Sequence, residues 1–325
     1  MNPFEVTRLG STDVRVTRLG LGMAPIGGLY GKTGDEQARA TVATAWDAGI
    51  RYFDTAPLYG NGLSERRAGV VLQDKPRDEF TLSTKVGRPL APRPVSEQDI
   101  WAEPGPDATH FDFTVEGTAA SYQESLARLG LDRVDVLHIH DPDDHFEEAL
   151  AGSLVTLTRL RAEGSIGAVS AGMNQAPMLA DFVRTGELDC VLLAGRYTLL
   201  DQSGFADLLP LCTARGVSVV VGGAYNSGIL ADPRPGATYD YAPASATVLA
   251  RVLAVQEVCA RHNVPLRAAA LQFPYGHPAV ASVIVGARSP EEVRDAVEMA
   301  SHEIPGQLWR DLKGAGLLPG EVPLP

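Results

Sequence analysis

Four polar side chains stand at or just beyond the ends of strand-like segments in the first half of the chain. They are Asp54 at the end of 51–54, Tyr59 on the loop that follows, Lys85 at the end of 80–85 and His140 at the end of 134–140. A buried ammonium costs several kcal/mol unless it is paired, so we expect Asp54 to be the counter-ion of Lys85. The Lys85 charge is then expected to lower the pKa of Tyr59 from about 10, which makes the phenol a general acid or base. His140 can hydrogen-bond a substrate oxygen.

These residues meet only if their strands lie side by side, and the chain alternates strands with helices throughout. The predicted strands, apolar on both faces, are 19–23, 51–54, 80–85, 134–140, 165–171, 189–194, 217–221 and 281–285. Eight such strands favour a (β/α)₈ TIM barrel, within a single domain spanning 1–325, over an open doubly wound sheet. A short N-terminal hairpin precedes the barrel, and long loops follow the third strand (87–113) and the seventh (222–243). The barrel would gather the four side chains at one mouth.

Composition restricts the kind of partner. The 325 residues carry a formal net charge of -12, from 28 Lys and Arg against 40 Asp and Glu. Nucleic acid and anionic membranes reward basic surfaces, so we expect neither, and a small-molecule substrate instead. No signal peptide or membrane span is recognisable, which predicts a cytoplasmic protein, a monomer or small homo-oligomer. Cys190, Cys212 and Cys259 stand among apolar residues and are expected to be buried free thiols.

A metal site is the main alternative for the fourth strand end. The segment 138–145 reads HIHDPDDH, and a His-x-His strand places both imidazoles on one face. A metal-dependent barrel hydrolase would draw further ligands from other strand ends, but the fifth and sixth strands contain no histidine. We therefore predict no metal site, with His138 as a packed core histidine.

Residues 15 to 300 resemble the aldo-keto reductase family. The resemblance rests on 54–60 (DTAPLYG), Ser64-Glu65, 83–87 (STKVG) and 138–143 (HIHDPD). In that family an aspartate, a tyrosine, a lysine and a histidine form a catalytic tetrad, and the motifs place these roles on Asp54, Tyr59, Lys85 and His140.

The resemblance also implies a nicotinamide cofactor, NAD or NADP, bound across the barrel mouth without a dinucleotide-binding domain. The positions it points to are Asn174, Tyr225, Ser227, Gly228, Leu230, Gly286, Arg288, Ser289 and Glu292. Ser289 and backbone amides at a helix N-terminus suit a phosphate. Cations and an amide common in NADP-preferring members fall here on Gly286, Val293 and Ala296, so NAD is slightly favoured, while Arg288 keeps NADP open.

Within the family, the chain is most similar to the sugar 1-dehydrogenase branch, which acts on L-fucose, D-threo-aldoses or L-galactose. The resemblance implies oxidation of the anomeric C1 hydroxyl of an aldose to a lactone, with Tyr59 as general base. Aromatic residues on the loops are expected to contact the substrate, with Tyr30, Trp101 and Phe111 as the main candidates and Tyr239 and Tyr241 as further ones. The alternatives are a pyridoxal 4-dehydrogenase, a general NADPH-dependent aldehyde or ketone reductase, and a non-catalytic NADP-binding module.

Overall fold

Eight parallel strands close into a barrel in the computed structural model, which describes residues 1–92 and 100–325. Around the barrel the strands follow the order β10, β11, β14, β3, β4, β5, β8, β9, and β9 pairs with β10 to close it. Their bounds are β3 Leu19–Gly22, β4 Tyr52–Asp54, β5 Thr81–Val86, β8 Val136–His140, β9 Ala168–Met173, β10 Cys190–Ala194, β11 Ser218–Gly222 and β14 Val280–Gly286. The predicted (β/α)₈ barrel is confirmed, with each strand within a few residues of its expected position.

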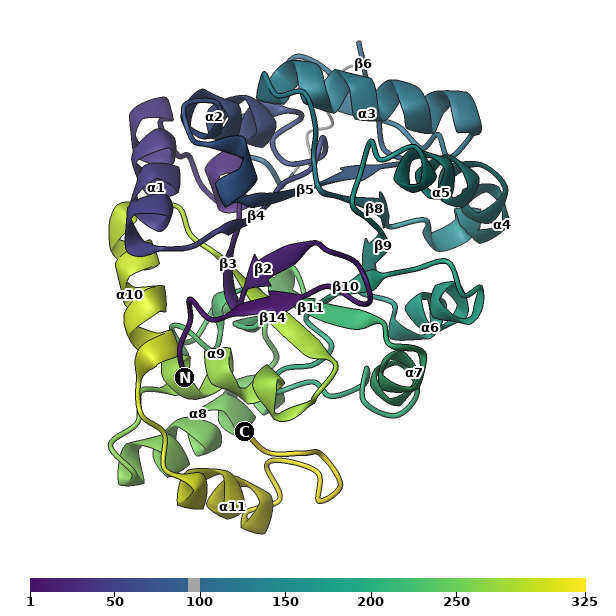
Figure 1. Cartoon of the computed structure of the whole chain (residues 1–325). Helices are drawn as coiled ribbons and strands as arrows, with labels where there is room; N and C mark the ends of the chain where they lie inside the picture. The colour runs from purple at the N-terminus through teal and green to yellow at the C-terminus, as the bar shows by residue number, and fades with distance from the viewer. Residues whose placement is uncertain (93–99) are drawn as a thin grey trace.

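Helices form a ring around these strands (Figure 1). They are α1 Asp35–Ala48, α2 Leu63–Leu72, α3 Val115–Leu129, α4 Phe146–Glu148, α5 Val155–Ala162, α6 Ala176–Arg184, α7 Leu208–Arg215, α8 Ala246–Arg261, α9 Leu266–Gln272, α10 Pro290–Ser301 and α11 Gly306–Gly314. The first and last helices of the ring, α1 and α10, pack side by side. A π-helical segment, Ala149–Leu154, joins α4 to α5.

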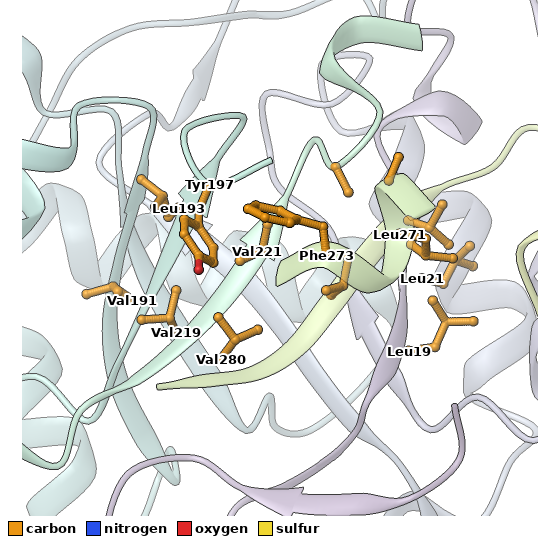
Figure 2. Packing of buried hydrophobic residues seen from close by; sticks show 14 of the residues in the cluster. Leu19, Leu21, Val191, Leu193, Tyr197, Val219, Val221, Leu271, Phe273 and Val280 are labelled. Carbon is orange, nitrogen blue, oxygen red and sulfur yellow. The ribbon is translucent and has the colours of Figure 1, made fainter. Parts of the chain in front are cut away.

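Each strand buries both faces, which explains the apolar runs in the sequence. On β10 and β11, Val191, Leu193, Val219 and Val221 belong to the cluster between strands and helices (Figure 2). The residues between them, such as Leu192, face the barrel interior, because successive side chains of a strand point to opposite sides. Near their ends, β4, β5 and β8 carry the buried polar side chains of Asp54, Lys85 and His140.

The N-terminal hairpin closes the barrel at the end opposite the mouth. It consists of β1 (Val6–Arg8) and β2 (Arg15–Thr17), paired antiparallel as predicted, and it lies across the barrel in Figure 1. Leu9 and Val16 enter the interior cluster, and the amide of Gly10 donates to Ser218 Oγ at the start of β11 (2.8 Å). The hairpin is therefore a plug at the base of the barrel.

The two long loops carry short strand pairs. β6 (Leu90–Ala91) pairs with β7 (Ala108–Thr109), and β12 (Thr238–Tyr239) pairs with β13 (Ala242–Pro243). Asp240 and Tyr241 form the β12–β13 turn with positive φ angles of 50° and 63°. Part of the predicted first loop, 93–99, lies outside the described residues.

Serine is a common N-cap residue, so the sequence before Leu72 predicts Ser64 as the N-cap of α2, but Gly62 occupies that position with φ 84°. The hydroxyl of Ser64 instead donates to the carbonyl of Met23 (2.8 Å) and contacts Thr55 Oγ1 (2.8 Å). A serine near a helix start thus serves the packing between strand ends.

The cysteine prediction is confirmed, since all three cysteines are buried free thiols. Burial raises the pKa of the Cys190 thiol to about 12. Within residues 1–92 and 100–325, no helix is long and apolar enough to cross a membrane.

Candidate active site

Asp54 and Lys85 form a fully buried ion pair at the ends of two adjacent strands. Lys85 Nζ donates to Asp54 Oδ2 (2.7 Å) and to the carbonyl of Thr55 (2.8 Å), and Ser83 Oγ donates to Asp54 Oδ1 (2.7 Å). The side chains are 0% and 1% exposed. A buried pair of this kind is stable only when further hydrogen bonds satisfy both groups, as they do here. The prediction that Asp54 is the counter-ion of Lys85 is confirmed.

Tyr59 lies directly beside this pair, on the loop after β4. Lys85 Nζ is 4.7 Å from the centroid of the Tyr59 ring. The loop approaches the turn after β3 so closely that a Cβ on Gly60 would come 2.2 Å from the carbonyl oxygen of Gly27. Only glycine permits this contact, and Gly60 also has φ 63°. The absence of side chains on Gly27 and Gly60 thus lets the Tyr59 loop lie directly against the turn after β3.

His140 is the fourth residue of this group, and Trp101 packs on Tyr59 from another loop. The rings of His140 and Tyr59 meet edge to face with centroids 6.0 Å apart, and Trp101 lies 5.7 Å from Tyr59. Burial and the charge of Lys85 hold the pKa of His140 well below its usual range, so its imidazole is neutral. A neutral imidazole can donate one hydrogen bond to a substrate oxygen.

The expected lowering of the Tyr59 pKa is wrong in direction. Burial raises the pKa of the Tyr59 phenol well above its usual value near 10, and the carboxylates of Asp54 and Asp141 add to the rise. Asp54 neutralises Lys85 by direct contact, so little of the ammonium charge acts on the phenol. At neutral pH Tyr59 is therefore a protonated phenol, suited to donate a proton to a carbonyl oxygen.

The Ser64-Glu65 motif supports these side chains from outside the barrel. Glu65 is fully buried at the start of α2, where its carboxylate accepts from Thr84 Oγ1 (2.7 Å) on β5 and from Arg128 Nε (2.5 Å) on α3. The backbone amide of Ser64 donates to the carbonyl of Tyr59 (3.1 Å). The motif fixes the tyrosine loop and the lysine strand relative to each other.

A cavity of about 630 Å³ opens next to this group. Its wall includes Asp54 and Tyr59 and reaches the start of α10 through Gly286, Arg288 and Glu292. A second hollow of about 530 Å³ lies over the start of α6 and shares Asn174 and Arg196, but it contains none of the four predicted catalytic residues. We therefore place the site in the first cavity.

Seven of the nine predicted cofactor positions lie in the cavity wall. They are Asn174, Tyr225, Ser227, Gly228, Gly286, Arg288 and Glu292. Leu230 is instead fully buried in the core. Ser289 caps α10, with its hydroxyl accepting from the amide of Glu292 (3.3 Å), and the Glu292 carboxylate accepts from the amide of Arg288 (2.8 Å). Two of the amides at this helix start are thus bonded to side chains of the protein itself.

The predicted substrate residues are spread over three positions. Tyr30 lies in the cavity wall, and the centroid of its ring is 6.5 Å from that of Tyr241. Trp101 is not among the residues of that wall; its backbone pairs with Leu29 and its ring packs on the ring of Tyr59. Phe111 is 46% exposed, outside that wall, and stacks on Phe113 (6.0 Å).

Several wall residues were not found from the sequence. Arg196 on the loop after β10 pairs with Asp240 at the tip of the β12–β13 turn (2.8 Å). Arg267 of α9 pairs with Asp295 of α10 through two hydrogen bonds of 3.0 and 2.7 Å. No local pattern distinguishes these charges from surface charges, since only the fold brings them to the cavity.

The histidine and aspartate segment of β8 does not assemble ligands. In the part of the chain that the structure describes, no cluster of three or more His, Cys, Asp or Glu side chains could hold a metal. His138 is fully buried, with Nδ1 2.7 Å from Ser170 Oγ and Nε2 3.6 Å from Asp54 Oδ1. Burial holds the pKa of His138 well below its usual range, so it is a neutral core residue next to Asp54.

The cavity fits an extended nicotinamide dinucleotide. Its wall contains glycines from three strand ends, Gly22, Gly222 and Gly286, whose missing side chains let a ligand approach the backbone. The buried Tyr225 hydroxyl lines it and has no hydrogen-bond partner among the described residues. Such a cofactor, when bound, supplies the site that accepts or donates hydride. Together with the buried Asp-Lys pair and its phenol, this defines a barrel-type NAD(P)-dependent oxidoreductase.

The chain is similar to known proteins along most of its length. It belongs to the aldo/keto reductase family, whose profile matches residues 18–316. It is 42% identical to D-threo-aldose 1-dehydrogenase from Pseudomonas sp over 95% of this chain and 97% of that one. Pyridoxal 4-dehydrogenase from Microbacterium luteolum is 40% identical over 97% and 98% of the two chains. L-galactose dehydrogenase from Arabidopsis thaliana is 31% identical over 91% and 88%.

The fold is shared with solved structures. An aldo-keto reductase from Bacillus halodurans, in its holo form, superposes with a TM-score of 0.76 over 95% of each chain at 23% identity. Family membership confirms the oxidoreductase prediction. It also decides against the metal-hydrolase alternative.

Proposed function

We propose that the enzyme oxidises the hemiacetal carbon of a cyclic aldose to a lactone. The observation that carries the proposal is the position of Tyr59, whose phenol lies in the cavity wall between Lys85 and His140. Tyr59, in its tyrosinate form, accepts the proton of the C1 hydroxyl while C1 loses hydride to the bound cofactor, and the C1 oxygen becomes the lactone carbonyl. His140 orients that oxygen.

The relatives support this class of substrate. Their printed names specify D-threo-aldose, pyridoxal and L-galactose. Aldoses close into rings whose C1 carries a hydroxyl, and pyridoxal closes likewise because its hydroxymethyl group adjoins its aldehyde. A cyclic hemiacetal is therefore common to all three. Pyridoxal oxidation is the second candidate, since that relative is almost as similar as the first.

The protonated state of Tyr59 favours a third candidate, the reduction of aldehydes or ketones. A neutral phenol donates a proton readily to a carbonyl oxygen, whereas oxidation needs it as tyrosinate. Reduction with NADPH is the alternative that the same geometry serves. The direction of the reaction is thus a matter for kinetics at controlled pH.

We propose NAD in preference to NADP. Three carboxylates line the far part of the cavity, on Glu291, Glu292 and Asp295. The two arginines among them are already paired, Arg267 with Asp295 and Arg288 with Glu292 (3.3 Å). A 2′-phosphate would meet net negative charge, while a ribose hydroxyl can donate to a carboxylate. Arg288 remains the cation through which NADP could bind.

The test follows the absorbance of the reduced cofactor with purified enzyme. NAD and NADP are each offered with L-fucose, D-arabinose, L-galactose and pyridoxal, and the product is identified as a lactone by nuclear magnetic resonance. We expect rapid reduction of NAD with at least one aldose. Oxidation of none of them, together with reduction of a simple aldehyde by NADPH, would refute the proposal.

A further inference from the structure

A second ion pair joins the ends of the two strands that carry Lys85 and His140. Arg88 follows β5 and Asp141 follows β8, and Arg88 Nη1 lies 2.9 Å from Asp141 Oδ2. The same carboxylate oxygen is 3.5 Å from His140 Nε2. The two side chains are 21% and 26% exposed, so the pair is half-buried at the barrel mouth beside a predicted catalytic residue.

The surrounding chain holds this pair in an unusual conformation. Asp141 has φ 44°, in the left-handed region that non-glycine residues rarely adopt, and its amide donates to the carbonyl of Gly172 (3.2 Å). Arg88 packs over the ring of Phe111 at 5.0 Å. Strained backbone beside a catalytic group is more typical of functional sites than of simple loop anchors.

The pair has little use as a regulator of the phenol. Asp141 raises the pKa of Tyr59 and Arg88 lowers it, so the two neighbouring charges act in opposite directions. What they retain is hydrogen-bonding capacity. Within 1–92 and 100–325 the bond to Asp141 is the one hydrogen bond of the Arg88 guanidinium, and Asp141 Oδ1 accepts none. A guanidinium has five N–H donors and a carboxylate about four acceptor sites.

We propose that Arg88 and Asp141 bind hydroxyl groups of the substrate next to the reacting carbon, and so select polyhydroxylated substrates over plain aldehydes. Asp141 accepts from one hydroxyl and Arg88 donates to its neighbour, while Phe111 shields the guanidinium from water. Asp141 Oδ2 lies 3.5 Å from His140 Nε2, so a substrate oxygen bonded to His140 would bring its neighbouring hydroxyl toward this pair. This inference deepens the proposed function and rests on it.

The test compares substrates that differ by one hydroxyl. For oxidation these are an aldose and its 2-deoxy analogue, and for reduction they are lactaldehyde and propionaldehyde. We expect the wild-type enzyme to prefer the hydroxylated substrate by about 10- to 100-fold in kcat/KM, the range of hydrogen bonds to charged groups. Arg88→Gln and Asp141→Asn should each bring that ratio close to one, chiefly through the KM of the hydroxylated substrate.

The chain contains a matched control at the other end of the same two strands. Arg77 and Asp135 precede β5 and β8, their side chains are 14% and 22% exposed, and Arg77 Nη2 lies 2.7 Å from Asp135 Oδ2. Arg77→Gln and Asp135→Asn each remove a similar ion pair between the strands. They should lower stability without changing the ratio of kcat/KM between the hydroxylated substrate and its analogue.

The outcomes separate the two proposals. A wild-type ratio near one, or Arg88 and Asp141 variants that keep the wild-type ratio, overturns the inference. The two aldehydes offered for reduction test the roles of Arg88 and Asp141 even if no hemiacetal is oxidised. A failure to oxidise any hemiacetal is the separate outcome that refutes the proposed function.

Discussion

The two parts of the cavity differ in how firmly their side chains are held. At the reacting part, Asp54 and Lys85 are 0% and 1% exposed and bond to each other and to neighbouring strands. At the far part, Arg288 and Glu292 are each 46% exposed and pair across the start of α10. Burial strengthens electrostatic interactions and makes their loss costly, whereas exposed pairs contribute little.

This difference indicates which functions can change by substitution at little cost in stability. Proton transfer depends on buried groups that support each other, so substitutions there damage both stability and activity. Cofactor preference depends on exposed side chains of α10 and the preceding loop, so it can change at little cost in stability.

Breaking the buried pair should have the largest consequences. Asp54→Asn leaves the Lys85 ammonium without its counter-ion and should destabilise the protein by about 3–5 kcal/mol, besides removing most activity. Urea unfolding followed by circular dichroism measures the first effect. The double variant with Lys85→Met should recover part of the stability and none of the activity. Equal stability of Asp54→Asn and wild type would contradict the account of this pair.

Removing the phenol should affect catalysis alone. Tyr59→Phe keeps the ring that packs on Trp101 and His140, so the fold should be unchanged, while kcat should fall by about 10²–10⁴-fold in both directions. Cofactor affinity, followed by fluorescence titration, should remain within a few fold of wild type. An active Tyr59→Phe enzyme would remove Tyr59 from the assigned role.

The raised pKa of Tyr59 sets the sign of the pH dependence. Oxidation needs tyrosinate, whose fraction falls about tenfold per pH unit below the pKa, so kcat/KM for oxidation should rise steadily from pH 7 to 9. Reduction needs the neutral phenol and should stay level over the same range. A plateau of the oxidation rate below pH 9 would show that the phenol ionises more easily than its burial implies.

The smallest effect is expected at the cofactor part. Glu292→Gln removes one negative charge from the cavity wall and should raise the kcat/KM ratio of NADP to NAD by about 3- to 10-fold, with less than 1 kcal/mol change in stability. Glu298→Gln, on the exposed side of the same helix, is the control and should leave the ratio unchanged. The absence of any shift for Glu292→Gln would separate cofactor choice from this carboxylate.

Much of the site could be predicted because it lies in short segments with strong local patterns. Asp54, Lys85 and His140 each end an apolar run, and parallel strands of a barrel bring such ends together. The cofactor residues were predicted less completely. Leu230 lies in the core and Ser289 serves as a helix cap, since sequence matching identifies a segment but not the direction of each side chain.

The sequence by itself determined the alternation of strands and helices, and with it the barrel and the Asp54-Lys85 pair, because both depend on local periodicity and on the cost of an unpaired buried charge. The tertiary structure alone decided the protonation of Tyr59 and the pairing of Arg88 with Asp141. A pKa depends on burial and on every charge nearby, and these two side chains, 53 residues apart, meet only where β5 and β8 end side by side.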